Sequence, residues 1–257
     1  MKLRKVQVVI GLCSLLLASH ASIASAAEIK ALITIAMQSV FEELGPQFEK
    51  ASGHKLAMSF ALSNVMAKRI QEDEAADYVV STRGGVDGLV KSGKILPGSD
   101  ISLVRSSIGI AVRKGAPKPD ISTTDAFKRT LLAAKSISYT NPAAGGPSGV
   151  HFAKVLERLG IAEEMKAKTK FPPAGGFTAQ LLASGEVEMA VQQIGELVLA
   201  SGVELVGPLP GDLQNVTVYT AAIPITAKEP GAAKDLIKFL QSPESIAVMK
   251  AKGLDPI

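Results

Sequence analysis

Hydrophobic residues along this chain recur with two alternating periods, and this alternation predicts the fold class. Short apolar runs rich in β-branched residues indicate buried strands. Between them, apolar residues such as Phe41, Leu44 and Phe48 recur at helical spacing. Strands are expected at residues 29–35, 56–60, 78–81, 107–112, 137–140, 187–191, 203–206 and 216–222, and helices at 40–51, 64–71, 125–134, 148–159, 178–184, 232–240 and 243–251. Such alternation is typical of an α/β protein with parallel sheets flanked by helices.

A glycine-rich segment, residues 141–149 (NPAAGGPSG), lies between a predicted strand and a predicted helix. Such a turn directs free backbone N–H groups and the positive end of the helix dipole at one point, which is typical of anion-binding sites. Asn141 and Ser148 add polar side chains to this segment. An ordinary strand-to-helix connection explains the pattern equally well.

Three further helices also begin close to a hydroxyl side chain. Ser39 and Glu42 form a capping-box pattern, Ser63 and Asn64 open the next helix, and Thr178 follows a second glycine-rich turn. Capping of its own helix is the simpler explanation for each hydroxyl. However, these helices follow strands, and ligands of open α/β sheets lie at the carboxyl ends of the strands. The hydroxyls are therefore also candidates for a shared anion site.

The first 26 residues have the pattern of an export signal. Lys2, Arg4 and Lys5 precede an apolar run over residues 8–18, and Ala-Ser-Ala at 24–26 matches a cleavage site. Leu12 is too large for the position before a lipidated cysteine, so no lipid anchor is expected. No later apolar stretch has the ~20 residues needed to span a bilayer. A periplasmic protein that starts at Ala27 is predicted.

Removal of this segment changes what the composition implies. Of the 28 Lys and Arg residues three lie in the signal, which leaves 25 basic against 24 acidic side chains and gives no electrostatic reason for nucleic-acid binding. The single cysteine, Cys13, also lies in the signal, which argues against disulfides and thiol chemistry. Two remaining histidines, His54 and His151, make a zinc site improbable. No metal or cofactor is expected, and residues 146–150 match neither a hydrolase nucleophile elbow nor a P-loop.

Several segments resemble periplasmic solute-binding proteins, in particular the molybdate-binding-protein-like branch of the type II periplasmic binding fold. The segments that carry the resemblance are residues 41–54, 59–64, 76–81 and 147–160, and the similarity extends over nearly the whole mature chain. The resemblance implies two α/β lobes, each a mainly parallel sheet flanked by helices, with a ligand cleft between them. Lobe one is expected at 27–104 plus 223–257 and lobe two at 105–222. Hinge bending would close the cleft on the ligand.

The chain departs from the molybdate-binding members at positions that matter for the ligand. Those members hold a tetrahedral oxyanion with hydroxyl and backbone N–H groups. Here Ala36 stands at the first serine position of the family, Ser63 matches the second, and Gln193 stands in place of a tyrosine. Ser148 falls where the family presents a backbone N–H group. These changes argue against molybdate or tungstate as the ligand.

Other polar side chains favour a larger anion. Arg83 follows the third predicted strand, and its guanidinium is suited to bidentate carboxylate binding, although a solvated loop arginine is equally consistent. Asn141, Gln192 and Gln193 could donate to further oxygens, although strand alternation makes Gln192 the weaker candidate. This mixed set of amides, hydroxyls and a guanidinium fits a di- or tricarboxylate better than a compact tetrahedral anion.

Two functions follow from these observations. The first is an exported, monomeric solute-binding protein that captures a small anion for uptake through an ABC-type membrane permease. The second comes from the likeness of this branch to aconitate isomerase, which interconverts cis- and trans-aconitate by proton transfer. His151, in the first turn of its helix, is the candidate base for that reaction, although a helix-face histidine is more often structural. His54 has the weaker claim.

Overall fold

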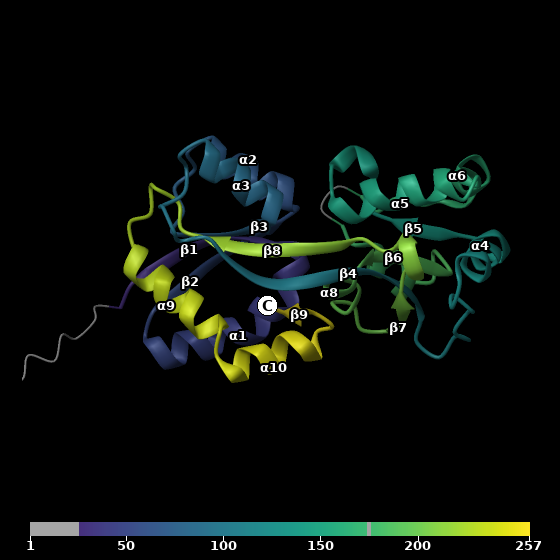
Figure 1. The fold of residues 1–257 in the computed structure, drawn as a ribbon. Helices are drawn as coiled ribbons and strands as arrows, with labels where there is room; N and C mark the ends of the chain where they lie inside the picture. The colour runs from purple at the N-terminus through teal and green to yellow at the C-terminus, as the bar shows by residue number, and fades with distance from the viewer. Residues whose placement is uncertain (1–25, 174–175) are drawn as a thin grey trace, which may run out of the picture.

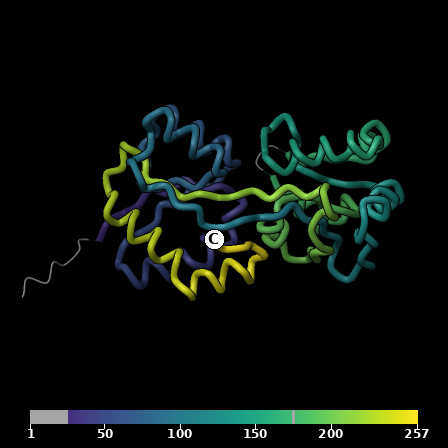
Figure 2. The backbone as a smooth tube through the Cα atoms, in the orientation of Figure 1, coloured from purple at the N-terminus to yellow at the C-terminus, as the bar shows by residue number. Residues whose placement is uncertain are grey.

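The computed structural model describes residues 26–173 and 176–257, so nearly all of the predicted export signal lies outside the described residues. Two lobes lie side by side and are connected by two strands that run from one lobe into the other (Figure 1). The backbone tube shows these strands adjacent over most of their length (Figure 2). The predicted class, an α/β fold with two lobes, is confirmed by these elements. Among the described residues, no helix combines the length and apolar character needed to cross a membrane.

The first lobe is built from both ends of the chain. Its strands are β1 (Glu28–Thr34), β2 (Lys55–Ala61), β3 (Tyr78–Thr82) and the short β9 (Asp255–Pro256), and its helices are η1 (Ile35–Met37), α1 (Gln38–Ser52), α2 (Ser63–Gln71), α3 (Arg83–Lys91), α9 (Pro230–Leu240) and α10 (Pro243–Ala251). The parallel strands β2, β1 and β3 continue into the antiparallel strand β8 (Val216–Ala222). Successive side chains of β1 alternate between two cores, because strand residues point to opposite faces: Ala31 and Ile33 enter one core and Leu32 the other.

The second lobe has a smaller sheet with helices on both faces. Its elements are α4 (Thr124–Ala133), β5 (Ile137–Tyr139), η2 (Pro142–Ala144), α5 (Pro147–Arg158), α6 (Ala162–Lys168), α7 (Thr178–Ala183), β6 (Met189–Gln193), α8 (Ile194–Leu197), β7 (Val203–Pro208) and η3 (Gly211–Leu213). Only β5 and β6 pair in parallel, whereas β6 and β7 flank β4 (Ile101–Arg113) in antiparallel fashion, so the expectation of a mainly parallel sheet is wrong for this lobe. Phe127, Phe152 and Val191 lie in one core, and Ala190 and Leu182 lie in the other.

The strand β4 belongs to both sheets and changes partner within its length. Residues 101–107 pair with β8 in the first sheet, and from Ile108 onward the strand pairs with β6 in the second. The chain returns through η3 into β8, which pairs with β3 of the first lobe. The lobe boundaries expected at residues 104 and 222 stay a prediction; the strand pairing itself places residues 216–222 in the first sheet.

The predicted helices and strands are present, with their ends shifted by a few residues. The elements that were not predicted are α3, α6, α8, β9, the three 3-10 turns and the first half of β4. The predicted capping box at Ser39 is wrong, since α1 begins at Gln38 with Met37 at its N-cap and no side-chain cap. A 3-10 turn, η1, leads directly into α1 and moves the start of the helix ahead of the serine.

Candidate functional site: a cavity between the lobes

A cavity of about 340 Å³ lies where the two lobes face each other, a size typical of small-molecule sites. Its lining residues come from the carboxyl ends of strands and from the segments that follow them, where ligands of α/β proteins bind. Lobe one contributes Ile35, Phe60, Ala61, Leu62 and Val65, and lobe two contributes Thr140, Asn141, Ala144, Pro172, Pro173, Gly176 and Gln192. Within the described part of the chain, no lysine, arginine or histidine lines the cavity.

The starts of helices α2 and α5 meet across the cleft. Leu62 is the N-cap of α2 and Gly146 the N-cap of α5, and neither helix has a side-chain cap. A Cβ atom at Gly146 would lie 3.4 Å from Leu62 Cδ2 and 2.9 Å from Thr140 Cγ2, so this position packs closely against Thr140 and is in ordinary contact distance of Leu62. The first N–H groups of each helix lack intrahelical acceptors and carry the positive end of the dipole. These two helix starts therefore provide neutral donors for an anion.

One hydrogen bond joins the lobes beside the cavity. Asn64 Nδ2, on α2, donates to the carbonyl of Ala144 in η2 at 3.0 Å. Gly145 follows with φ of +74°, and a Cβ there would lie 2.6 Å from Asn64 Nδ2. The absence of a side chain at Gly145 thus leaves room for the Asn64 amide to cross from lobe one to the carbonyl of Ala144 in lobe two. The structure brings Asn64 and the predicted anion-binding segment together at the rim of the cavity.

Thr140, at the end of β5, carries a buried hydroxyl without a partner. The residue is 7% exposed and lines the cavity, and its Oγ1 has no hydrogen-bond partner among the described residues. An unsatisfied buried hydroxyl costs about 1–3 kcal/mol relative to a satisfied one. The Oγ1 atom is closed off from solvent, so a ligand oxygen in the cavity would satisfy it after a rotation of the side chain. No sequence pattern singles out this residue, because threonine is common in strands.

Gln192 also lines the cavity, and both ends of its amide are held by buried neighbours. Its Oε1 accepts from Thr178 Oγ1 and its Nε2 donates to a carboxylate oxygen of Glu196. All three residues are at most 4% exposed. Strand alternation makes Gln192 the weaker candidate donor, yet it does border the cavity. The second sheet is covered on both faces, so alternation alone does not tell which face borders the cavity.

Glu196 has a strongly perturbed environment. Burial raises the pKa of this carboxyl to about 8, and the hydrogen bond from Gln192 lowers it by a smaller amount. Because the folded pKa exceeds the unfolded one, the folded state binds more protons than the unfolded state between pH about 4.5 and about 8. The contribution of Glu196 to the free energy of unfolding is therefore fully present below this pH range, and it is lost as the pH rises through the range.

The other predicted site residues divide into two groups. Asn141 lines the cavity and also accepts a hydrogen bond from the backbone N–H of Ala143. Ser63 and Ser148 are buried at the starts of α2 and α5, and the Ser63 hydroxyl pairs with Thr34 Oγ1 at 2.8 Å. These residues surround the same helix starts that face the cleft.

Apart from Gln192, Asn141 is the only predicted residue among the described ones that line this cavity. Ser63, Asn64 and Ser148 lie at the helix starts beside it, and the other four are held by contacts elsewhere. Ser39 Oγ donates to the carbonyl of Gly195 at 3.4 Å, and Arg83 forms ion pairs with the carboxylates of Asp87 and Asp100. In the orientation that satisfies its amide, Gln193 accepts from Thr217 Oγ1 and donates to Ser106 Oγ. His151 Nε2 donates to the carbonyl of Leu213 at 2.8 Å.

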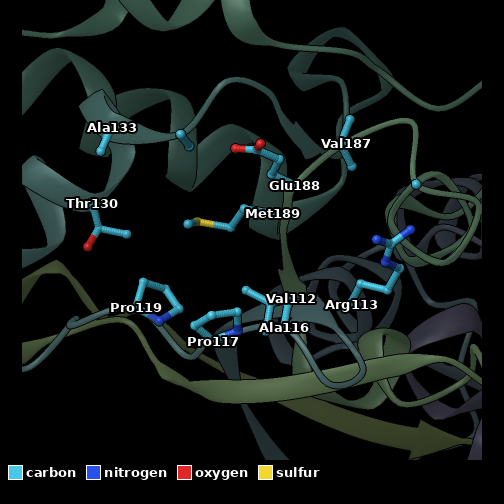
Figure 3. Close-up of a pocket in the computed structure, with 12 residues that line it drawn as sticks. Val112, Arg113, Ala116, Pro117, Pro119, Thr130, Ala133, Val187, Glu188 and Met189 are labelled. Carbon is cyan, nitrogen blue, oxygen red and sulfur yellow. The ribbon is translucent and has the colours of Figure 1, made fainter.

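A larger cavity, of about 570 Å³, lies entirely within the second lobe (Figure 3). It is formed at the ends of β4 and β6 opposite to Gln192, and Met189 extends into it toward Thr130 and Pro119. The first lobe contributes nothing to its lining. The smaller cavity between the lobes, with its convergent helix starts and its orphaned hydroxyl, is therefore the better candidate for the ligand site.

Comparison with known proteins identifies the family. A family model described as bacterial extracellular solute-binding protein matches residues 29–255. The chain belongs to this family. Within it the chain is similar to a molybdate-binding protein ModA from Azotobacter vinelandii, with 28% identity over 90% of each chain. It is therefore a ModA-like solute-binding protein, as the resemblance implied.

Two further comparisons concern this ModA-like protein. An aconitate isomerase from a Pseudomonas species is 36% identical over 221 residues, which cover 84% of this chain and 82% of that enzyme. The solved Azotobacter vinelandii periplasmic molybdate-binding protein superposes with a TM-score of 0.72 at 20% identity, covering 88% of this chain and 98% of that one. The structural likeness supports the fold, and the ligand has to be argued from the cavity.

Proposed function

We propose that this ModA-like protein binds a small organic polycarboxylate, of the tricarboxylate class that includes aconitate, in the cavity between its lobes. The observation that carries the proposal is the unpartnered hydroxyl of Thr140 in the wall of a cavity that is otherwise largely apolar. Carboxylate oxygens would accept from this hydroxyl and from the N–H groups at the starts of α2 and α5. The carbon skeleton would pack against Ile35, Phe60 and Val65.

A compact oxyanion such as molybdate fits these features less well. Its whole surface consists of acceptor oxygens, so contact with Ile35, Phe60, Leu62 or Val65 would leave some of them desolvated without a donor. The 36% identical relative, named an aconitate isomerase, supports the same preference. In its transport role the protein would be exported and would deliver its ligand to a membrane permease.

A ligand screen by thermal shift tests this proposal. We expect trans-aconitate or a related tricarboxylate to raise the melting temperature, because a ligand that binds only the folded state stabilises it by about 2.7 kcal/mol at a concentration one hundred times Kd. Molybdate, tungstate and sulfate serve as compact-anion controls, and acetate as a control for a single carboxylate. A shift with molybdate alone would contradict the proposal.

A second candidate function is isomerisation of cis- and trans-aconitate, favoured by the same relative. The reaction removes a proton from a carbon next to a carboxylate and returns it to another carbon of the same skeleton, so it needs a base and donors for the charge that develops. The sequence predicts His151 as the base, and its bond to Leu213 leaves Nδ1 open. Because His151 does not line the cavity, it would reach a bound substrate only after the cleft rearranges.

A turnover assay separates the two functions. Purified protein is mixed with trans-aconitate, and the cis isomer is followed by NMR; binding without any cis product identifies a transport protein. If product forms, loss of turnover in His151→Ala with binding retained would support His151 as the base, and it would require closure of the cleft to bring the imidazole to the substrate. Full activity of His151→Ala would rule it out as the base, and His54→Ala is the control.

A further inference from the structure

The buried carboxyl of Glu196 lies one hydrogen bond away from the cavity. It is 4% exposed in the short helix α8, and its only side-chain partner in the described structure is the amide of Gln192. Gln192 in turn lines the cavity and accepts from Thr178. We infer that Glu196 is a positioning residue that sets the orientation of the Gln192 amide and thereby makes anion binding depend on pH. This inference rests on the proposed binding of a polycarboxylate in the cavity.

The hydrogen-bond chemistry of the three side chains gives Gln192 two possible orientations. An ionised carboxylate only accepts hydrogen bonds, so it holds the N–H end of Gln192 toward itself and leaves the amide oxygen on the side of Thr178. A protonated Glu196 can instead donate its O–H to the amide oxygen. The amide can then turn its N–H group toward Thr178 and the cavity, where an anion needs donors.

Both effects of protonation favour a bound anion. The neutral form removes a negative charge from the wall behind Gln192, and it also frees the amide N–H for the ligand side. Burial raises the pKa of Glu196 to about 8, so the change between the two forms falls within a range accessible to experiment. The carboxyl groups of the ligand titrate well below that range and stay ionised throughout.

Other charged groups around Glu196 do not account for such a pH dependence. The neighbouring β6, η1 and α7 carry no titratable side chain, and Tyr219 of β8 is buried with its pKa raised well above its ordinary value. The charged side chains of the other packed elements, α1, β4 and β7, are exposed or only partly buried: Glu42, Glu43, Glu49, Lys50, Arg105, Arg113 and Glu204. Glu196 is therefore the group whose titration would be felt in the cavity.

The test is calorimetric titration with trans-aconitate from about pH 6 to about pH 9. We expect the affinity of the wild-type protein to fall by at least about tenfold across this range, since a charge added in a buried wall repels the anion through a low dielectric. Glu196→Gln is neutral at every pH and should keep the high affinity throughout. Glu204→Gln, at a solvent-accessible carboxylate paired with Lys118, is the control and should retain the wild-type profile.

The outcomes separate this inference from the proposed function. Binding that stays constant with pH in the wild-type protein, or that falls equally in Glu196→Gln, overturns the inference and leaves the proposed function intact. Absence of binding at every pH overturns the proposed function and the inference with it. The wild-type profile decides the matter even if Glu196→Gln does not fold, and a merely structural role of Glu196 would not produce a midpoint near its pKa.

Discussion

Gly149→Ala is expected to destabilise the protein by more than about 3 kcal/mol, at or beyond the upper end of typical overpacking changes. A Cβ atom at this position would lie 2.1 Å from the carbonyl oxygen of Thr140 and 2.8 Å from its carbonyl carbon. These are backbone atoms at the end of β5, so they cannot rotate away as a side chain can. The substitution would push α5 away from the sheet, and with it the wall of the cavity that Thr140 forms.

Denaturant unfolding of the wild-type and variant proteins measures this effect. Gly88→Ala is the matched control, because Gly88 is also in a helix but no neighbouring atom lies within 4 Å of its Cβ position. Alanine there should stabilise the protein by about 0.5–1 kcal/mol through its higher helix propensity. Most surface substitutions change the free energy of unfolding by less than about 0.5 kcal/mol. If Gly149→Ala also changes it by no more than this, the close packing of α5 on β5 is not required.

The sequence predicted elements with strong periodicity and missed those that tertiary contacts stabilise. Helix α3 begins with Arg83 and contains three glycines, Gly84, Gly85 and Gly88, which argue against a helix. It forms because Val86 and Leu89 are buried in the core of the first lobe. Gly85 is needed there, since a Cβ would lie 2.9 Å from Ser81 Oγ. No local pattern reveals a packing requirement of this kind.

The candidate site was predictable in its location and less so in its individual residues. The segment from Asn141 to Gly149 was identified from its glycines and the following helix, and it does border the cavity. Thr140 and Glu196 were missed, and Gln192 was ranked behind Gln193, for physical reasons. Gln192 and Thr140 end strands whose neighbours are buried on both faces, so their pattern does not distinguish core from cavity. Glutamate is rarely buried, and nothing in the sequence around Glu196 indicates that it would be.

Thr140→Val is expected to stabilise the unliganded protein and to weaken ligand binding, two effects of opposite sign from one substitution. Valine keeps the shape of threonine and removes the hydroxyl, which has no partner among the described residues. Removing an unsatisfied buried hydroxyl should raise the free energy of unfolding by about 1–3 kcal/mol. A ligand carboxylate loses a charge-assisted hydrogen bond of about 1.5–3 kcal/mol, so Kd for trans-aconitate should rise roughly tenfold to a hundredfold.

Ser138→Ala provides the matched control for this experiment. Ser138 lies two residues earlier on β5 and is fully buried, and its Oγ also has no partner in the described structure, but it does not line the cavity. Ser138→Ala should therefore leave Kd unchanged. Any loss of stability should be no larger than the cost of the small void that the missing hydroxyl leaves. If Thr140→Val and Ser138→Ala change calorimetric Kd equally, the hydroxyl of Thr140 is not a ligand contact. If Thr140→Val stabilises the unliganded protein and also weakens binding, the partner that the hydroxyl lacks is the ligand.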